Sequence, residues 1–136
     1  MIIKGRSIAK GVAEGELIMT DSPISFLSGV DPDTGIIIEK GHPLEGVSIT
    51  GKVLAFPFGK GSTVGSYVIY ALKKNDCAPA AMINSEAEAI IAVGAIISGI
   101  PMIDRLEGDL SSLKSGMAVT VDGDRGELIC KDQANS

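Results

Sequence analysis

A glycine-rich loop that carries two hydroxyl side chains is the segment of this sequence best suited to chemistry. It reads Gly59-Lys60-Gly61-Ser62-Thr63 and lies between an apolar run and a helical pattern. Glycine lets a backbone bend sharply and approach a ligand without a Cβ in the way. The amide groups and the dipole of a helix N-terminus favour an anion. The loop therefore predicts a site for a carboxylate or phosphate, with the Ser62 hydroxyl beside it.

Simpler interpretations of this loop stay open. A serine that follows glycines before a helix is often only the N-cap of that helix, worth about 1 kcal/mol. The ammonium of Lys60 either adds positive charge to the site or lies on the surface without a role. An ATP-binding P-loop is excluded, because that loop needs a serine or threonine directly after its lysine, and here Gly61 follows Lys60.

Two further loops are expected at the same edge of the sheet. Asn84, Ser85 and Glu86 follow one apolar segment, and Asp104 and Arg105 follow another. A guanidinium binds a carboxylate or phosphate through two parallel hydrogen bonds, so Arg105 is a candidate substrate ligand. A surface ion pair is the commoner role for such an arginine, and helix capping explains Ser85 equally well.

The elements that must position these loops follow a β-α-β-α-β pattern. The predicted strands are short apolar segments at residues 52–56, 80–83 and 101–103. A helix with one apolar face follows Thr63, and a capping box of Ser85 and Glu88 opens a second helix that ends near Gly99. Such a pattern predicts parallel strands joined by right-handed crossovers, with the three loops at their carboxyl ends.

The flanking segments predict strands and turns. The expected strands cover Met1–Ile8, Gly15–Thr20 and Ile24–Val30, and a hairpin covers Met117–Cys130. The sequence contains neither an internal repeat nor a linker. We therefore expect a single α/β domain over residues 1–136 that ends in a polar tail at 131–136.

Charge and composition exclude several classes of protein. A net charge of −5 without a basic run makes nucleic acid an unexpected partner. The longest apolar run, residues 89–97, is too short for a membrane span, and the N-terminus lacks a signal peptide, so the cytoplasm is expected. Cys77 and Cys130 make neither a disulfide framework nor a metal-ligand cluster. The 45% of hydrophobic residues fits either a dense aliphatic core or apolar surface exposed to a partner.

Five strings spread over most of the chain resemble the aconitase X small-subunit family. They are DPDTG (31–35), GHPLEG (41–46), GKVLAFPFGKGSTVGSYVIYAL (51–72), PAAMINSEAEAI (79–90) and GAIISGIPMID (94–104). Their order and spacing also match the family pattern, and the string with the glycine loop is the most specific. The resemblance implies a swivelling β/β/α domain with a mixed, barrel-like sheet flanked by helices.

The resemblance also implies a reaction and a partner. Within this family the implied reaction removes water from (R)-5-phosphomevalonate and gives trans-anhydromevalonate 5-phosphate, a step of the mevalonate pathway of isoprenoid biosynthesis. Ser62 is then the proton acceptor. The residues expected around the substrate are Gly59, Lys60, Gly61, Thr63 and Arg105. A large subunit brings a 4Fe–4S cluster that binds the departing hydroxyl, so this chain binds no metal, is inactive alone and works in a heterodimer.

Three alternatives stay open. An aconitase X dehydratase that acts on hydroxyproline or another hydroxy acid shares the serine and the cluster. A non-catalytic anion-binding module keeps the loop without the chemistry. A phosphohistidine swivelling domain needs a reactive histidine on its glycine-rich loop, whereas the only histidine of the chain, His42, lies outside it and is expected to be structural.

Overall fold

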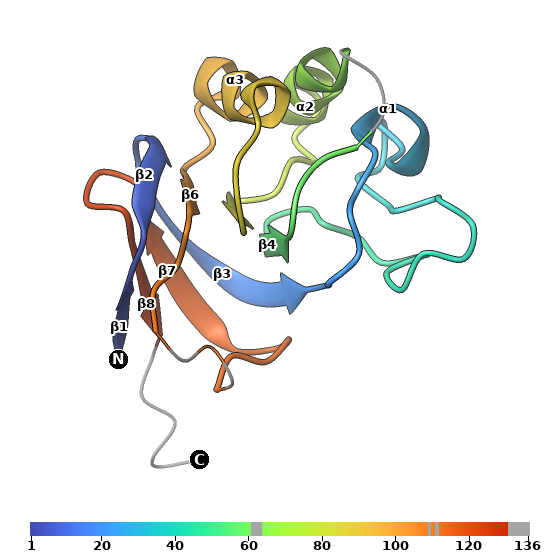
Figure 1. Ribbon diagram of the computed structural model, residues 1–136. Helices are drawn as coiled ribbons and strands as arrows, with labels where there is room; N and C mark the ends of the chain where they lie inside the picture. Colours follow the sequence, from blue (N-terminus) through green and yellow to red (C-terminus); the bar gives the residue numbers. More distant parts are fainter. Residues whose placement is uncertain (61–63, 109, 111, 131–136) are drawn as a thin grey trace.

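The N-terminal segment closes an eight-strand mixed sheet into a barrel-like form. The order across the sheet is β1-β8-β7-β3-β4-β5-β6-β2. β1 pairs with β8 at one end of this order and β2 pairs with β6 at the other, yet Gly5 alone separates β1 from β2 in the sequence. The computed structural model describes residues 1–60, 64–108, 110 and 112–130, and Figure 1 shows how the sheet curls round.

The bounds of the elements are as follows. The strands are β1 (Ile2–Lys4), β2 (Arg6–Ala9), β3 (Val12–Met19), β4 (Val53–Phe56), β5 (Ala81–Asn84), β6 (Met102–Asp104), β7 (Ala118–Asp122) and β8 (Glu127–Cys130). The helices are α1 (Phe26–Gly29), α2 (Gly65–Lys74) and α3 (Ala89–Ser98). In the described ranges, every helix falls short of the length and hydropathy that a membrane crossing needs.

The predicted β-α-β-α-β core and C-terminal hairpin are confirmed. β3, β4, β5 and β6 run parallel to one another, and α2 and α3 lie side by side over one face of this part of the sheet (Figure 1). The hairpin of β7 and β8 pairs antiparallel, with Asp122 opposite Glu127 at its turn. The parallel strands therefore deliver their loops to a common edge.

Two buried clusters of apolar side chains fill the two sides of the sheet. Successive side chains of a strand point to opposite faces. Leu54 and Phe56 of β4 accordingly join the cluster under the helices. Val53 and Ala55 join the cluster inside the barrel. Because both faces are covered, β4 is an uninterrupted apolar run rather than an alternating one.

The strand predicted for Met1–Ile8 is wrong in one respect, because Gly5 divides it between two partners. A Cβ on Gly5 would lie 2.5 Å from the carbonyl oxygen of Asp104, so a larger residue does not fit there. The Gly5 amide donates to the carbonyl of Gly126 at 2.7 Å. Glycine thus permits the close backbone approach at the point where the N-terminal segment stops pairing with β8 and starts pairing with β6.

The strand predicted for Ile24–Val30 is also wrong. Its centre forms the short helix α1, and only Ile24 and Val30 take part in isolated bridges. The hydroxyl of Ser25 accepts a hydrogen bond from the amide of Ser28 at 3.5 Å. Serine at an N-cap position competes with extended structure, and it decides the local conformation here.

The helix α3 begins later than the predicted capping box. Its N-cap is Glu88, whose carboxylate accepts hydrogen bonds from the amides of Ile90 and Ile91 at 3.0 and 2.8 Å. Ser85 lies outside the helix and donates its amide to the carbonyl of Pro57. A carboxylate satisfies two amides and complements the helix dipole, so Glu88 replaces Ser85 as the cap.

Candidate active site

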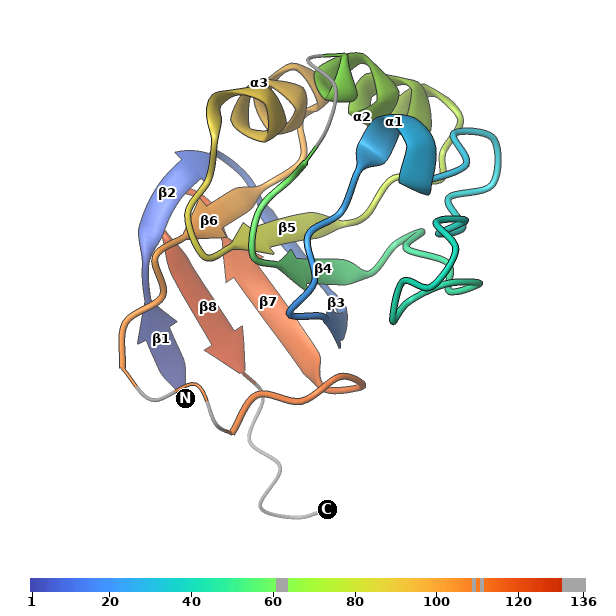
Figure 2. The same cartoon turned by 45° about the vertical axis from the view of Figure 1, so that its right-hand side comes forward.

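The loops after β3, β4, β5 and β6 meet at one edge, because the carboxyl ends of parallel strands lie together. Figure 2 shows the arrowheads of β4 and β5 on the same side of the molecule. Residues 57–60 follow β4 directly, Arg105 follows β6 directly, and Asn84 is the last residue of β5. The structure therefore brings the described part of the glycine loop and the two other polar loops to a common edge, as predicted.

Backbone hydrogen bonds join these loops to one another. The carbonyl of Pro57 accepts from the amides of Ser85 and Glu86 at 3.0 and 3.5 Å. The carbonyl of Ser85 in turn accepts from the amide of Arg105 at 3.2 Å. The loops after β4, β5 and β6 thus form one braced unit rather than three independent segments.

A buried carboxylate ties this unit to β2. Both oxygens of Asp104 accept hydrogen bonds from the guanidinium of Arg6, at 2.9 and 2.7 Å, and the amide of Ala87 donates to Oδ2 at 2.7 Å. The hydrogen bond to Asp104 is the main cause that raises the pKa of Arg6. Arg6 could not be predicted from the sequence, because its partner lies 98 residues away and leaves no local signal.

Arg105 forms the surface ion pair that the sequence analysis described as its commoner role. Its Nε and Nη2 donate to the two oxygens of Glu86 at 2.7 and 2.5 Å. The hydrogen bond lowers the pKa of Glu86 and raises that of Arg105. The backbone of Arg105 has a φ of 52°, in the left-handed region that non-glycine residues seldom adopt. A substrate anion that binds Nε and Nη2 together would have to displace Glu86 from this guanidinium.

A cavity of about 310 Å³ opens beside Arg105 at the mouth of the barrel. Its lining is mostly apolar, but Asn84 also contributes. The amide nitrogen of Asn84 donates to the carbonyls of Phe56 and Ile83 at 3.0 and 3.2 Å, whereas Oδ1 has no partner among the described residues. Buried polar atoms are normally hydrogen-bonded, so this oxygen is an exception, and almost none of its surface is accessible from the cavity.

Gly59 is required by helix packing. The segment 58–60 runs alongside residues 20–24. The amide of Ile24 donates to the carbonyl of Phe58 at 3.3 Å, and the amide of Lys60 donates to the carbonyl of Ile24 at 3.0 Å. A Cβ on Gly59 would lie 2.5 Å from Cγ1 of Ile91 in α3. The backbone at Gly59 does not adopt a positive φ. Its observed reason for being glycine is therefore contact with α3, not the sharp bend that we expected.

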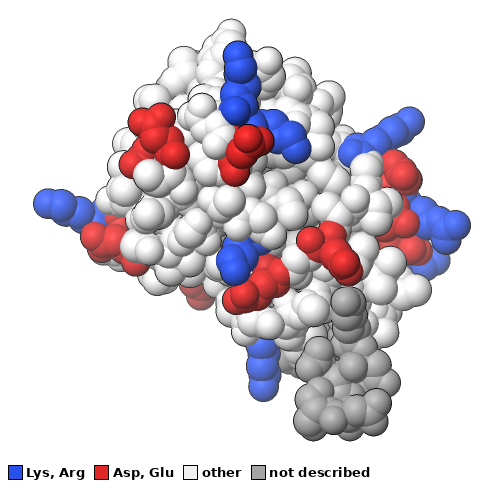
Figure 3. Space-filling view, turned by 180° about the vertical axis from the view of Figure 1, so that it is seen from behind, with Lys and Arg blue, Asp and Glu red and all other residues white. Residues whose placement is uncertain are grey.

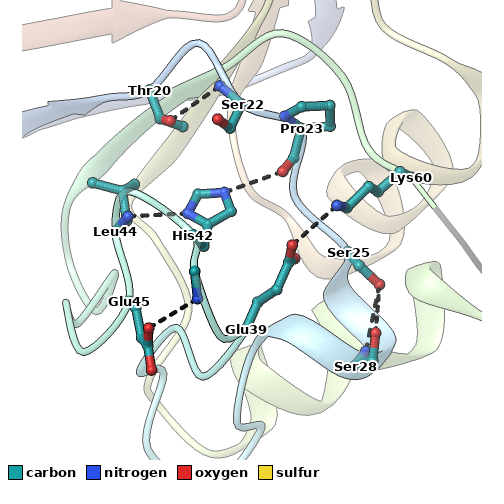
Figure 4. Close-up of polar contacts among 11 residues, drawn as sticks. Thr20, Ser22, Pro23, Ser25, Ser28, Glu39, His42, Leu44, Glu45 and Lys60 are labelled. Atoms are coloured by element: carbon teal, nitrogen blue, oxygen red, sulfur yellow. Dashed lines mark hydrogen bonds and ion pairs between the residues drawn. The ribbon is translucent and has the colours of Figure 1, made fainter.

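Lys60 reaches from the glycine loop to a neighbouring loop, as Figure 4 shows. Its Nζ lies 3.0 Å from Oε2 of Glu39. The neighbouring loop is anchored by the buried His42, whose Nδ1 accepts from the amide of Leu44 at 3.0 Å and whose Nε2 lies 3.1 Å from the carbonyl of Pro23. Nε2 must therefore carry the proton. The expected structural role of His42 is confirmed, and both of its ring nitrogens are engaged.

Gly61, Ser62 and Thr63 lie outside the described residues, so their roles stay predictions. The next residue, Val64, is the N-cap of α2, and the first turn of α2 carries no acidic side chain. In α3, by contrast, Glu88 occupies the amides at the corresponding end. The positive end of the α2 dipole is thus not neutralised by a carboxylate of its own first turn, which suits an external anion.

The two cysteines do not fit the ligand set of an iron–sulfur cluster, which is normally held by several thiolates. Cys77 belongs to the cluster under the helices and Cys130 to the cluster inside the barrel. Burial is the main cause that raises the pKa of both thiols, which disfavours the thiolate form. The described part of the chain also contains no group of three or more His, Cys, Asp or Glu side chains that could hold a metal ion.

The closed mixed sheet with helices on one face and braced loops at its carboxyl edge defines a swivelling β/β/α domain. The chain belongs to the aconitase X swivel domain family, whose model matches residues 2–130. The fold and the family expected from the sequence are thus confirmed.

Relatives of known name cover almost the whole chain. It is 62% identical over 128 residues to the phosphomevalonate dehydratase small subunit of Pyrococcus furiosus, an alignment that covers 94% of each chain. It is 61% identical over 126 residues to the protein of the same name from Methanosarcina mazei, covering 92% of this chain and 88% of that one. Among solved structures it is similar to the holo-form of Thermococcus kodakaraensis aconitase X, with a TM-score of 0.92, 57% identity and coverage of 97% and 99%.

Proposed function

We propose that this chain is the small subunit of a phosphomevalonate dehydratase, which removes water from (R)-5-phosphomevalonate to give trans-anhydromevalonate 5-phosphate. The observation that carries the proposal is the 62% identity, over 94% of both chains, to a protein named as that small subunit. In this proposal a large subunit completes the active site, and the small subunit alone has no activity.

Within this site we assign the proton transfer to Ser62. Taking a proton from a carbon next to a carboxylate builds negative charge on an already anionic group, so fixed positive dipoles must stabilise that charge. The start of α2 supplies such dipoles, and its first turn carries no acidic residue. An unaided hydroxyl is a poor base, and these dipoles favour its deprotonated form.

The remaining loop residues act on binding. Gly59, Gly61 and Thr63 present backbone and hydroxyl groups to the substrate, and Lys60 contributes positive charge from its position beside Glu39. Arg105 binds a substrate anion when that anion replaces Glu86. The 4Fe–4S cluster implied by the family belongs to the large subunit in this proposal, because the cysteines of this chain do not fit it.

The test is an anaerobic assay of the complex reconstituted from this chain and its large subunit. We expect the wild-type complex to dehydrate (R)-5-phosphomevalonate. Ser62→Ala should lower kcat by roughly 10²-fold or more, the size expected for loss of a general base, while the complex still assembles. Ser48→Ala is the control. The Ser48 hydroxyl accepts a local hydrogen bond from the amide of Thr50 and has no other hydrogen-bond partner among the described residues, so its loss should leave kcat unchanged.

Each competing function has its own outcome in this assay. Turnover of hydroxyproline or another hydroxy acid, without turnover of the phosphorylated substrate, would reassign the substrate. Full activity of the Ser62→Ala complex would reduce this chain to a non-catalytic anion-binding subunit.

A further inference from the structure

The outward faces of α2 and α3 expose large apolar side chains over adjoining helices. On α2 these are Tyr67 and Tyr70, and on α3 they are Val93, Ile96 and Ile97. The residues recur at spacings of three and four, so each set forms one stripe along its helix. We name these five residues the helix-face patch. The ten residues of α3 include no charged side chain, which is unusual for a helix that faces solvent on one side.

The two helices hold the patch in a fixed arrangement. Gly94 of α3 packs directly against α2, where an added Cβ would lie 2.8 Å from Cδ1 of Ile69 and 3.1 Å from Cα of Ser66. Ile69 is fully buried, so the contact lies on the inner side of the pair and leaves the outer stripes free. A patch whose residues cannot move apart loses little conformational entropy when a partner covers it.

We infer that the helix-face patch is the surface on which the large subunit docks, an inference that rests on the proposed function. Scattered exposed apolar residues need no explanation, whereas two tyrosines, a valine and two isoleucines on adjoining helices have the composition of the centre of a lasting interface. The Lys74 ammonium lies against the patch, 5.9 Å from the centroid of the Tyr70 ring. The related proteins of Pyrococcus furiosus and Methanosarcina mazei are named small subunits, so a larger chain exists to cover such a surface. The net charge of −5 disfavours a second copy of this chain as the occupant.

The position of the patch supports the same partner. α2 begins two residues after the glycine loop, and Tyr67 lies in its first turn. Tyr67 is 70% exposed, the largest exposed fraction among the large apolar side chains of the described chain. A large subunit that covers the start of α2 therefore meets Tyr67, and it can continue along α2 onto α3. On the face seen from behind, Lys and Arg are spread over the surface and most of them lie near Asp or Glu (Figure 3).

The test compares two equally exposed isoleucines, one inside the patch on α3 and one outside it on β1. Ile96 of the patch and Ile2 of β1 are each 58% exposed, so a lysine at either site meets the same degree of solvation in the free chain. We expect Ile96→Lys to raise the Kd for the purified large subunit by roughly tenfold or more, because the interface would bury an unpaired charge. Ile2→Lys should leave the Kd within about twofold of wild type. Tyr67→Ala, a second patch variant that adds no charge, should also weaken binding by roughly tenfold.

The outcomes separate this inference from the proposed function. Equal Kd values for Ile96→Lys, Tyr67→Ala and wild type would overturn the docking surface while leaving the dehydratase proposal intact. A self-associated wild-type chain that Ile96→Lys converts to monomer, with large-subunit binding unchanged, would assign the patch to a second copy and also overturn it. Failure of the wild-type chain itself to bind the large subunit would instead refute the proposed function. Circular dichroism of each variant checks that the fold is intact.

Discussion

Gly59→Ala should destabilise the protein, because the new methyl group would collide with α3. The added Cβ would lie 2.5 Å from Cγ1 and 2.6 Å from Cδ1 of Ile91, whereas carbon atoms in contact are about 3.5–4.0 Å apart. Ile91 is buried and β-branched, so its χ1 has little freedom to move Cγ1 away. Either the loop or α3 must shift by about 1 Å, on the contact distances just given.

The expected size follows from two opposing effects. Overpacking of a buried site costs about 1–3 kcal/mol. Alanine also restricts the unfolded chain, which returns about 0.4–1 kcal/mol where the backbone conformation is compatible, as at Gly59, which has no positive φ. Taken at the middle of both ranges, the free energy of unfolding should therefore fall by about 1.3 kcal/mol, measured by urea denaturation followed by circular dichroism.

The control is the same substitution in an Ile91→Ala background, which removes both clashing atoms. Ile91→Ala alone should lower the free energy of unfolding by about 2–5 kcal/mol. In that background the clashing atoms are absent, so adding Gly59→Ala should cost no more than a few tenths of a kcal/mol, about the deviation from additivity seen for independent sites. An equal cost in both backgrounds, or no loss of stability for Gly59→Ala, would refute the packing account. Glycine would then be required there only for the approach of a ligand.

The remaining predictions concern the helices, the edge and a thiol. Gly94→Val should lower the free energy of unfolding by more than about 1 kcal/mol in urea denaturation, because its Cβ would lie 2.8 Å from Cδ1 of Ile69; an unchanged midpoint would contradict the α2–α3 contact. The pKa of Glu86 is lowered by Arg105, so the ion pair stabilises the fold above the unfolded pKa of Glu86 and is lost as the pH falls through its folded pKa. An NMR titration should give Glu86 a pKa below the usual range of a glutamate, and Arg105→Ala should raise that pKa again. Burial raises the pKa of Cys77, so a thiol reagent at neutral pH should label it only after unfolding, and rapid labelling of the native chain would be inconsistent with this burial.

The parallel core of the fold could be predicted because its signals are local. The segment 52–56 is a short apolar run followed by helical periodicity, and β4 occupies Val53–Phe56. The segment 80–83 likewise corresponds to β5 at Ala81–Asn84. Because parallel strands deliver their loops to one edge, the position of Arg105 beside Asn84 followed from the same pattern.

The closure of the sheet and several contacts at the candidate site could not be predicted, because they join residues far apart in the sequence and no local pattern encodes them. The closure of the sheet requires β2 to leave β1 at Gly5 and pair with a strand about a hundred positions away, and a single glycine in an apolar segment does not specify that change of partner. Glu39 was missed for the same reason, since it meets Lys60 across 21 positions. The apolar composition fitted either a dense core or apolar surface exposed to a partner, and only the structure shows which large apolar side chains of α2 and α3 are exposed.

In the proposed function, the hydrogen bonds that join the loops at this edge hold the small subunit's part of the active site in place before the large subunit docks. A hydrogen-bond donor or dipole stabilises developing charge best when it is already in place, because reorganisation at the moment of reaction costs free energy. Here Pro57, at the start of the glycine loop, is bonded to the loop after β5, and that loop is bonded to Asp104, which Arg6 holds from β2. A substitution of Arg6 should therefore loosen the loops at this edge as well as the pairing of β2 with β6. On this reasoning the barrel closure, which no local pattern of the sequence encodes, is part of what positions the loop that a local pattern does reveal.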